Sequence, residues 1–357
     1  MFPVALMPRR VLFLTTARDQ MQSFEDAAMR LGVQLVPFEL RAGDDVADNA
    51  ASAAIAFARG NAIDACMAAD SRAAIVAASV ARALRFPGHP PGAADISRNK
   101  LLTRERLRDS DLLVPWFFPT SLSADPAALA AMVEFPCVIK PLVPSEGRGV
   151  MRADDAASCV AAFGRLRELL ASPAMSGEAA DDRTSALVEG FIDGWEFALE
   201  GVMHHGALNA LALFDKPDPL DGPLFEDSLY VTPSLAPEPM QWDILDAVSR
   251  ATAAIGLHHG PVHAECRVGD RGVFVLGVAA RPLASGWAKA LRFQKDGKGA
   301  KITYEELLLR HASGESPDGW RRETEASGAR KVPEVSRFIH ATAASPEEAE
   351  RALREAR

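Results

Sequence analysis

Residues 261–282 read PVHAECRVGDRGVFVLGVAARP. Two apolar runs flank the short polar group GDRG, a pattern that is typical of a β-hairpin. If the turn comprises residues 270–272, with its glycine at a positive φ, then Glu265 on the first strand lies opposite Gly277 on the second. The predicted register therefore makes one site from both strands.

The same register places two more polar side chains near this site. His263 would lie opposite Ala279, and Arg281 would project near the exit of the second strand, where its guanidinium could bind a phosphate bidentately. A hydrogen-bonded structural role is the simpler interpretation for His263, and a surface ion pair is the alternative for Arg281.

A lysine and a glycine-containing segment upstream form a second candidate site. Lys140 ends a short apolar run and is followed by residues 141–150, PLVPSEGRGV. Gly147 and Gly149 would let backbone N–H groups approach phosphate oxygens closely. The segment matches neither the Walker pattern nor the Gly-x-Gly-x-x-Gly fingerprint, and a glycine turn between two strands explains it equally well in isolation.

Two glutamates flank an apolar step in the segment 188–197, VEGFIDGWEF. A hinge of this kind could offer backbone groups to an adenine edge, while Glu189 and Glu196 accept hydrogen bonds from an amine and from ribose hydroxyls. Two exposed glutamates in a hairpin are the alternative interpretation.

The hydrophobic pattern at the amino terminus favours an α/β domain. Buried strands near residues 10–16 and 62–67 alternate with amphipathic, Ala-rich helices near 48–60 and 71–84, as in a parallel sheet covered on both faces. Prolines and a glycine over residues 87–92 interrupt regular structure and predict the end of this domain near residue 95.

The composition is that of a globular protein. Of 357 residues, 48% are apolar and 24% charged, and 39 basic against 48 acidic residues give a net charge of −9. This balance argues against non-specific binding to nucleic acid. The four cysteines lack CxxC spacing, so they predict neither a zinc site nor a disulfide framework. With no signal-peptide pattern and no membrane-length apolar run, we expect a cytoplasmic protein that partners neither membrane nor nucleic acid.

Together these elements resemble the ATP-grasp enzymes, most of all the carboxylate–amine ligases that include the bacterial L-amino acid ligases. The resemblance spans nearly the whole chain and rests on the order of common elements: the α/β N-terminal domain, Asn99-Lys100 opening a helix, Val138-Ile-Lys140, Ser145 to Gly149, Val188-Glu189, Trp195-Glu196, Glu265 and Ala280-Arg281-Pro282. It implies an α/β (α+β) chain with an ATP-grasp fold and an N-terminal α/β pre-ATP-grasp domain.

The resemblance also implies which residues bind ATP. These would be Lys100, Lys140, Ser145, Gly147, Gly149, Glu189, Ile192 and Glu196. The two lysines would contact the phosphates, and the loop over residues 145–149 would close over them. Glu189 and Ile192 would recognise adenine, and Glu196 would bind the ribose.

By the same similarity, Glu265 and Glu226 would hold Mg²⁺. Glu226 lies in residues 214–233, a loop shaped by proline and glycine that lies beside the acceptor and metal sites in the amino-acid-ligase branch. Glu265 and Arg281 are the expected catalytic residues, and Arg281 would steady the phosphoryl group during transfer. A rigid connection with its charged groups in water is the alternative for the loop.

The chain departs from the family pattern on the second hairpin strand. Gly277 stands where the family has a carboxylate, and Ala279 stands where it often has an asparagine. Oxygen ligands there normally hold magnesium against the nucleotide phosphates. Three explanations stay open: the acyl-phosphate step is lost or reduced, Glu265 and Glu226 with water still hold enough metal, or the glycine is an introduced change.

The resemblance implies an ATP- and Mg²⁺-dependent ligase that joins an amino acid or related small acid to an amine through an acyl phosphate. Residues 1–95 would form the N-terminal domain, 96–187 the linker helix and lid subdomain, and 188–357 the C-terminal subdomain. The alternative is a catalytically impaired ATP-binding relative that acts as a sensor or partner, and a structural α/β protein is a weaker one. The sequence leaves open the two substrates, the pathway and a homodimeric assembly.

Overall fold

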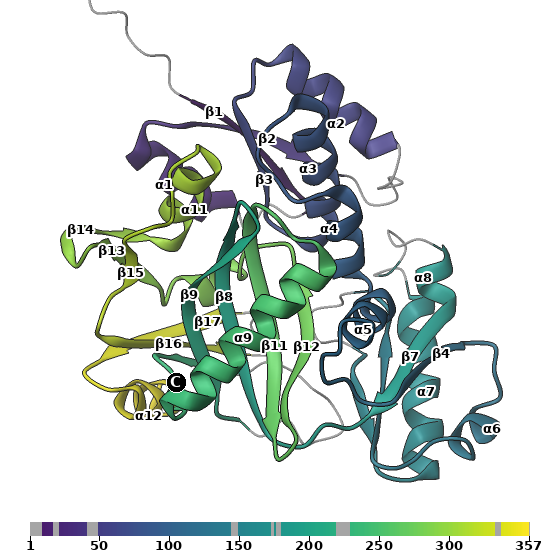
Figure 1. Cartoon of the computed structure of the whole chain (residues 1–357). Coiled ribbons are helices and arrows are strands. Elements are labelled where there is room, and N and C mark those ends of the chain that lie inside the picture. The colour runs from purple at the N-terminus through teal and green to yellow at the C-terminus, as the bar shows by residue number, and fades with distance from the viewer. Residues whose placement is uncertain are drawn as a thin grey trace, which may run out of the picture.

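An N-terminal α/β domain, a small domain and a large domain follow one another along the chain (Figure 1). The computed structural model describes residues 9–16, 21–40, 49–143, 149–172, 175, 180–218, 229–332 and 337–356. Among the sequence-predicted site residues, Ser145, Gly147 and Glu226 lie outside these ranges.

The N-terminal domain has a parallel sheet of strand order β2-β1-β3 with helices on both faces. Its elements are β1 (Arg10–Thr15), α1 (Met21–Leu31), β2 (Gln34–Glu39), α2 (Asn49–Gly60), β3 (Ala65–Ala68), α3 (Ser71–Leu84) and α4 (Pro91–Arg98). Leu12 and Leu14 of β1 pack in the core that contains α2 and α3, whereas Val11 and Phe13 pack with α1. Burial on both faces explains why β1 reads as an uninterrupted apolar run.

Helix α4 begins where the sequence pattern predicted an interruption. Pro91 occupies its first turn, where a proline lacks no needed hydrogen bond and its fixed φ suits the helix. The predicted interruption is thus present over residues 86–90, between α3 and α4, and is wrong only for residues 91 and 92, which are helical. The predicted domain boundaries, near residues 95 and 187, lie within α4 and within the strand at residues 185–190, and they stay predictions.

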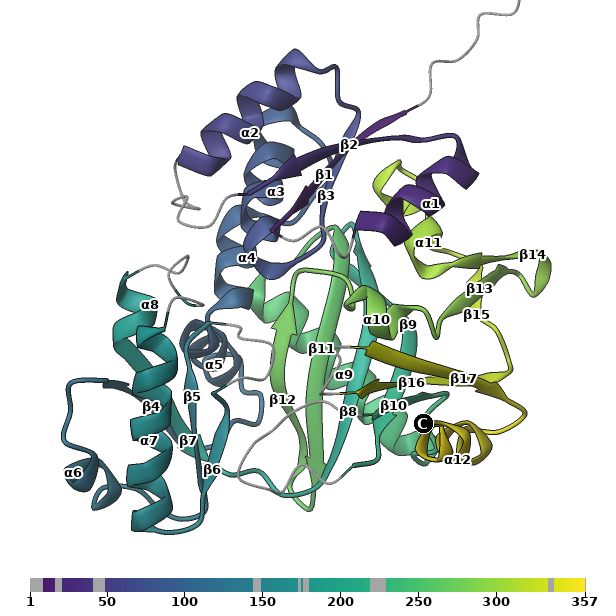
Figure 2. The same cartoon turned by 180° about the vertical axis from the view of Figure 1, so that it is seen from behind.

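The small domain has an antiparallel sheet of strand order β4-β7-β5-β6, and helix α5 links it to the N-terminal domain. Its elements are α5 (Lys100–Arg108), β4 (Phe117–Ser121), α6 (Pro126–Ala130), β5 (Cys137–Pro141), β6 (Met151–Ala153), α7 (Ala156–Ala171), α8 (Ala180–Thr184) and β7 (Ser185–Gly190). Ile139 and Val188 share a core with Phe163 and Leu166 of α7, which covers this sheet. Figures 1 and 2 both show α5 between the small sheet and the large domain.

The large domain is built on an antiparallel sheet of strand order β12-β11-β8-β9-β10-β16-β17. Its elements are β8 (Trp195–His204), β9 (Ala207–Lys216), β10 (Leu229–Thr232), α9 (Glu238–Ile255), β11 (Gly260–Gly269), β12 (Gly272–Ala279), α10 (Ser285–Ala288), β13 (Arg292–Lys295), β14 (Lys298–Thr303), α11 (Tyr304–Ala312), β15 (Trp320–Arg322), β16 (Ala326–Val332), β17 (Arg337–Ala343) and α12 (Pro346–Glu355). Strands β13 to β15 form a separate sheet of order β14-β13-β15.

The side chains of β8 alternate between two cores. Phe197 and Leu199 pack in the core that contains α9, whereas Ala198 and Val202 pack in the core that contains α10 and α11. Because strand side chains alternate, Glu196, Glu200 and the other even-numbered residues of β8 lie on the face opposite α9.

The predicted hairpin forms with the expected register at its functional end. Glu265 pairs with Gly277 and His263 with Ala279, as predicted. The turn itself is shorter than predicted, because Gly269 pairs with Gly272 and two residues close the hairpin. A β-bulge between Glu265 and Cys266 adds the missing residue and restores the register.

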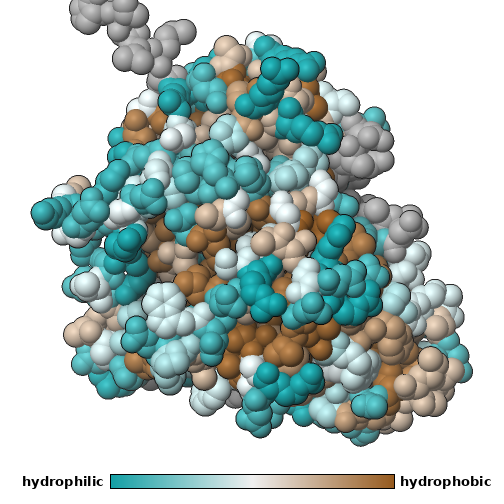
Figure 3. Space-filling view, in the orientation of Figure 1, coloured by the Kyte–Doolittle hydropathy of each residue, from teal (hydrophilic) through white to brown (hydrophobic). Residues whose placement is uncertain are grey.

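The face of the molecule that carries α9 shows hydrophilic and hydrophobic residues side by side, with a hydrophobic area across its lower middle (Figure 3). Within the described ranges, the structure contains no helix long and apolar enough to cross a membrane.

Candidate active site

Helix α5 directs two cations toward the small sheet. Asn99 caps this helix, its side chain accepting hydrogen bonds from the backbone N–H groups of Leu101 and Leu102. Lys100 and Arg104 are one helical turn apart and lie on the same side of α5. The Lys100 ammonium donates to the carbonyl of Val143 at 3.0 Å, so it lies at the carboxyl end of β5.

Glu189 on β7 forms ion pairs with Arg104 and with Lys140, the predicted phosphate ligand. Arg104 Nε donates to Glu189 Oε2 at 2.9 Å, Arg104 Nη1 donates to the carbonyl of Val275 at 2.8 Å, and Lys140 Nζ donates to Glu189 Oε1. All three charged side chains are buried. Burial opposes ionisation of Glu189, but the two cations outweigh it and lower its pKa to about 2.

Lys100, Lys140 and Glu265 lie near enough to one another for their charges to interact. Burial, and after it the nearby charge of Lys140, lower the pKa of Lys100 to about 7. Burial likewise lowers the pKa of Lys140 to about 8, partly offset by Glu189. The charge of Glu265 acts on both lysines, although it stands on β11 of the other domain. The two ammonium groups and this carboxylate are therefore near one another although they come from different domains.

A second buried network starts at Glu196. Lys216 Nζ donates to Glu196 Oε1, Arg267 Nε donates to Glu196 Oε2 at 2.8 Å, and Arg267 Nη1 donates to the carbonyl of Ile192 at 2.8 Å. Lys216 Nζ also lies 3.2 Å from Glu265 Oε1. Lys216 therefore bridges the expected ribose ligand and the expected metal ligand.

The network continues from Glu265 through a histidine. Tyr230 donates its hydroxyl to Glu265 Oε1 at 3.1 Å, and His263 Nε2 lies 3.8 Å from the same oxygen. The other ring nitrogen of His263 lies 3.0 Å from Glu200 Oε2. Burial favours neutral His263, but its hydrogen bonds to the two carboxylates raise the pKa above its ordinary value. Burial also opposes ionisation of Glu265, and Lys216 and His263 outweigh it and hold that pKa well below its ordinary value.

The structure places the remaining predicted residues as follows. The carboxylates of Glu189 and Glu196 and the carbonyl of Ile192 all have cationic partners, so a ligand would share or displace these contacts. Gly149 has a φ of +78°, and a Cβ there would lie 2.6 Å from Leu169 Cδ2, so this position requires glycine.

Arg281 extends toward the N-terminal domain. Its Nε donates to Ser71 Oγ at 3.2 Å, and its Nη1 donates to the carbonyl of Pro282 at 2.8 Å. Its charge also acts on His263, which places its guanidinium near the Glu265 end of the network.

Gly277 leaves a vacant position beside Glu265. A Cβ built at Gly277 would meet no atom of the described residues within 4 Å, and its φ is compatible with other residues. The described side chains thus offer Glu265 as a carboxylate ligand at this position, a third of its side chain being exposed. Because Mg²⁺ is commonly bound by one or two carboxylates together with substrate phosphates and water, this donor set fits magnesium only in the company of a nucleotide.

Sequence reasoning missed several cations and hydrogen-bond donors of the site. Arg104, Arg267 and Tyr230 were not singled out. The spacing of Lys100 and Arg104 on one helix face is a signal that could have identified Arg104. The role of Arg267 follows from the register, which pairs it with Glu196 across β11 and β8.

Comparison with known proteins identifies the fold. Residues 133–290 match the family model of the ATP-grasp domain. The chain is similar to the L-amino acid ligase from Bacillus licheniformis, with 23% identity, coverage of 98% of this chain and 97% of that chain, and a TM-score of 0.78. No protein among the curated sequences matches the chain significantly.

Two further solved structures share the arrangement. The N5-carboxyaminoimidazole synthetase from Staphylococcus aureus, complexed with ADP, is 11% identical over 97% of this chain and 96% of that chain, with a TM-score of 0.67. The biotin carboxylase domain dimer of 2-oxoglutarate carboxylase from Hydrogenobacter thermophilus, in complex with MgADP, ADP and bicarbonate, is 16% identical over 91% and 74%, with a TM-score of 0.62. Residues 133–290 therefore form an ATP-grasp domain, and the chain as a whole has the ATP-grasp fold.

Proposed function

We propose that the protein is an ATP-dependent carboxylate–amine ligase that joins an amino acid or a related small acid to an amine. The observation that carries this proposal is the proximity of Lys100, Lys140 and Glu265, which come from two domains and whose charges act on one another. Two neighbouring ammonium groups with lowered pKa values suit a polyphosphate, because an anion restores their charge and replaces lost solvation. The similarity to an L-amino acid ligase over nearly the whole of both chains supports the same reaction class.

The chain's own residues would position the nucleotide. Lys140 would exchange part of its contact with Glu189 for a phosphate oxygen, while Arg104 keeps the Glu189 carboxylate neutralised at 2.9 Å. The segment that ends at Gly149 would bring backbone N–H groups to the phosphates. Ile192 and Glu196 lie at the connection between β7 and β8, where adenine and ribose would bind.

Glu265 would hold Mg²⁺ together with the nucleotide phosphates, with Glu226 as the second proposed ligand. When bound, the ion neutralises charge on the phosphates as the γ-phosphoryl group moves. Lys216 and His263 keep Glu265 ionised, and the hydrogen bonds that Lys216 and Tyr230 donate to Oε1 fix its orientation.

The reaction would proceed in two displacements. A substrate carboxylate oxygen attacks the γ-phosphorus, the bond from that phosphorus to the β–γ bridging oxygen breaks, and ADP leaves. The amine then attacks the carbonyl carbon of the acyl phosphate, a C–N bond forms, and inorganic phosphate leaves with loss of a proton from nitrogen. Arg281, whose guanidinium lies near His263, would steady the phosphoryl group. Positioning and charge stabilisation, rather than covalent catalysis by the protein, carry both steps.

An activity screen tests this proposal. The purified protein is incubated with ATP, Mg²⁺ and pairs drawn from an amino-acid mixture, and ADP, phosphate and the ligated product are measured. We expect ADP and phosphate release that requires both an acid and an amine. ADP release that no amine stimulates would contradict the proposal.

A catalytically impaired ATP-binding relative, acting as a sensor or partner, is the second candidate. The open position at Gly277 favours it, because the carboxylate opposite Glu265 is missing. This candidate predicts ATP binding with negligible turnover by the native chain and activity in a Gly277→Glu variant. Brisk turnover by the native chain with a defined acid and amine would eliminate it.

A further inference from the structure

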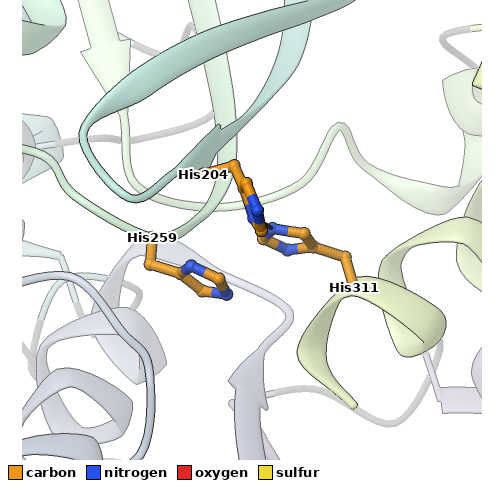
Figure 4. A group of neighbouring side chains, drawn as sticks. All are labelled: His204, His259 and His311. Carbon is orange, nitrogen blue, oxygen red and sulfur yellow. Dashed lines mark hydrogen bonds between the residues drawn. The ribbon is translucent and has the colours of Figure 1, made fainter. Parts of the chain in front are cut away.

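Three histidines from separate elements meet at the opposite end of β8 from Glu196. His204 ends β8, His259 precedes β11, and His311 lies on α11 (Figure 4). One ring nitrogen from each lies within 4.8 Å of the others. His259 is 5% exposed and His311 3% exposed, whereas His204 is half-buried, so two of the three side chains lie in the protein interior.

The ring nitrogens of His259 could bind a metal ion, and they make no hydrogen bond among the described residues. Both of its ring nitrogens are buried, and neither has a hydrogen-bond partner within the described part of the chain. Leaving a buried polar group unsatisfied costs about 1–3 kcal/mol, so buried imidazoles are normally hydrogen-bonded. His311 Nε2 lies 3.2 Å from His204 Nδ1, which leaves His259 as the unsatisfied member of the group.

A neighbouring histidine fixes the backbone that carries His259. His89 Nδ1 accepts a hydrogen bond from the backbone N–H of His258 at 3.1 Å, and its Nε2 lies 3.2 Å from the carbonyl of Pro261. The accepting Nδ1 requires the proton on Nε2, so His89 is neutral and spans the turn on both sides of His259. A buried contact from the N-terminal domain therefore fixes the position of His259.

The environment keeps His259 and His311 in the form that binds metals. Burial, followed by the surrounding imidazoles, lowers the pKa of His259 to about 4 and that of His311 to about 3. A neutral imidazole offers a lone pair, whereas an imidazolium does not. The ligand group contains no carboxylate.

The present ring positions lie close to a coordination geometry. Tetrahedral zinc with Zn–N bonds of about 2.0–2.1 Å places its nitrogens about 3.3 Å apart, so the three atoms need to close by at most about 1.5 Å. The rings of His259 and His311 stack with centroids 4.2 Å apart at 16°, and since lone pairs lie in the ring plane, one ring must turn about its Cβ–Cγ bond. A cavity of about 50 Å³ borders both rings and gives room for this turn and for a water molecule.

We propose that His204, His259 and His311 form a binding site for a late first-row transition metal ion, with Zn²⁺ as the expected occupant. Three imidazole nitrogen donors suit Zn²⁺, Co²⁺, Ni²⁺ or Cu²⁺, and three protein ligands leave the fourth position to water or to a ligand from the cavity. Mg²⁺ prefers oxygen and is excluded by the donor set. The site is separate from the nucleotide site, since His204 lies eight residues along β8 from Glu196, about 26 Å at the usual rise per residue.

A bound ion would link three segments of the chain that are distant in sequence. It would join the end of β8, the segment before β11 and α11, which itself packs against α1 of the N-terminal domain. The proposal does not depend on ligase activity, because none of the three histidines contacts the Lys100, Lys140 and Glu265 region in the described structure.

Cobalt titration of the metal-free full-length protein tests the proposal. Chelator-treated protein is titrated with Co²⁺ in excess Mg²⁺, which occupies oxygen sites, and visible d–d absorption is recorded before back-titration with Zn²⁺. We expect one equivalent of Co²⁺ with intense, tetrahedral-type bands that Zn²⁺ abolishes. Zn²⁺ should also raise the Tm, because an ion that binds only the folded chain stabilises it.

Three variants make the test specific. His259→Leu removes no recorded hydrogen bond and His311→Gln keeps a polar side chain, and each should weaken Co²⁺ binding at least about 100-fold, more than the loss typical of an outer-shell partner. His340→Gln is the matched control, because this exposed histidine lies outside the group of three and bonds the carbonyl of Gly286. Circular dichroism confirms that each variant is folded. If His311→Gln does not fold, the result for His259→Leu alone decides the test. Absence of stoichiometric binding by the native chain, or unchanged binding in a folded variant, overturns the proposal.

Discussion

The two ends of β8 hold buried polar side chains by opposite means. At the Glu196 end, the carboxylates of Glu196 and Glu265 have cationic partners, and Arg267 Nε lies 2.8 Å from Glu196 Oε2. At the His204 end, burial keeps His259 neutral, and this imidazole has no hydrogen-bond partner among the described residues. A charged network can exchange partners with a polyanion, whereas unsatisfied neutral nitrogens suit a cation. The contrast teaches that the same strand can present two sites of different chemistry.

The largest expected effect concerns the charged end and the stability of the fold. Arg104→Met removes the guanidinium that pairs with Glu189 and bonds the carbonyl of Val275. Breaking a buried pair costs about 3–5 kcal/mol, and since Lys140 still faces Glu189, we expect a loss of about 3 kcal/mol in the free energy of unfolding, measured by urea denaturation.

Arg108→Met is the matched control on the same helix. Arg108 is exposed and pairs with the exposed Asp109, so its loss should change stability by less than about 0.5 kcal/mol. Equal effects of the two substitutions would show that the buried cluster does not hold α5 to the sheet.

The next effect concerns nucleotide affinity. Lys140→Met removes one of the two ammonium groups of the proposed phosphate site, and a hydrogen bond to a charged group contributes about 1.5–3 kcal/mol. We expect ATP binding, measured by calorimetry, to weaken about 10- to 100-fold. Lys301→Met is the control. It removes a partly exposed lysine of β14, outside the proposed phosphate site, and should leave the affinity for ATP unchanged. Unaltered binding in Lys140→Met would remove this lysine from the site.

A gain of function distinguishes the two proposed functions. Gly277→Glu introduces a carboxylate into open space opposite Glu265 without a positive-φ conflict. We expect Mg²⁺-dependent ATP binding to tighten by about tenfold or more, because the loss of a group that supports a metal site typically costs about 10- to 100-fold in affinity. Turnover should rise with it. Gly277→Gln has the same length without the charge, so equal behaviour of the Glu and Gln variants would refute a metal-ligand role at this position.

The smallest effect is a pH dependence. Lys100 has a pKa of about 7 in the free protein, lowered first by burial, and bound phosphate should raise it. The contribution of Lys100 to ATP affinity is therefore fully present below about pH 7 and is lost as the pH rises toward the pKa of the complex. We expect affinity to fall by less than about tenfold per pH unit above pH 7, and Lys100→Gln should flatten the curve. A curve of the same slope in the variant would assign the titration to another group.

The sequence predicted the strand pairing that builds the site better than the ion pairs within it. The register of Glu265 with Gly277 was predicted correctly because hydrophobic alternation and a glycine turn constrain a hairpin locally, although the turn length was wrong and a bulge compensated for it. Asn99 as a helix cap was likewise readable from residue type.

Contacts between distant segments were not readable from these patterns. Arg104 meets Glu189 across 85 residues, and His204 meets His311 across 107. Such pairs depend on how the domains pack, which local periodicity does not encode. The adjacent histidines at 204–205 and 258–259, each pair at a strand end, were the available signal for the histidine group.

A crystal structure with Mg²⁺ and a non-hydrolysable ATP analogue would locate the nucleotide directly. We expect the phosphates between the ammonium groups of Lys100 and Lys140, with a metal ion bound by Glu265. A nucleotide bound elsewhere, or a saturating soak that leaves this space between the small domain and β11 empty, would contradict it.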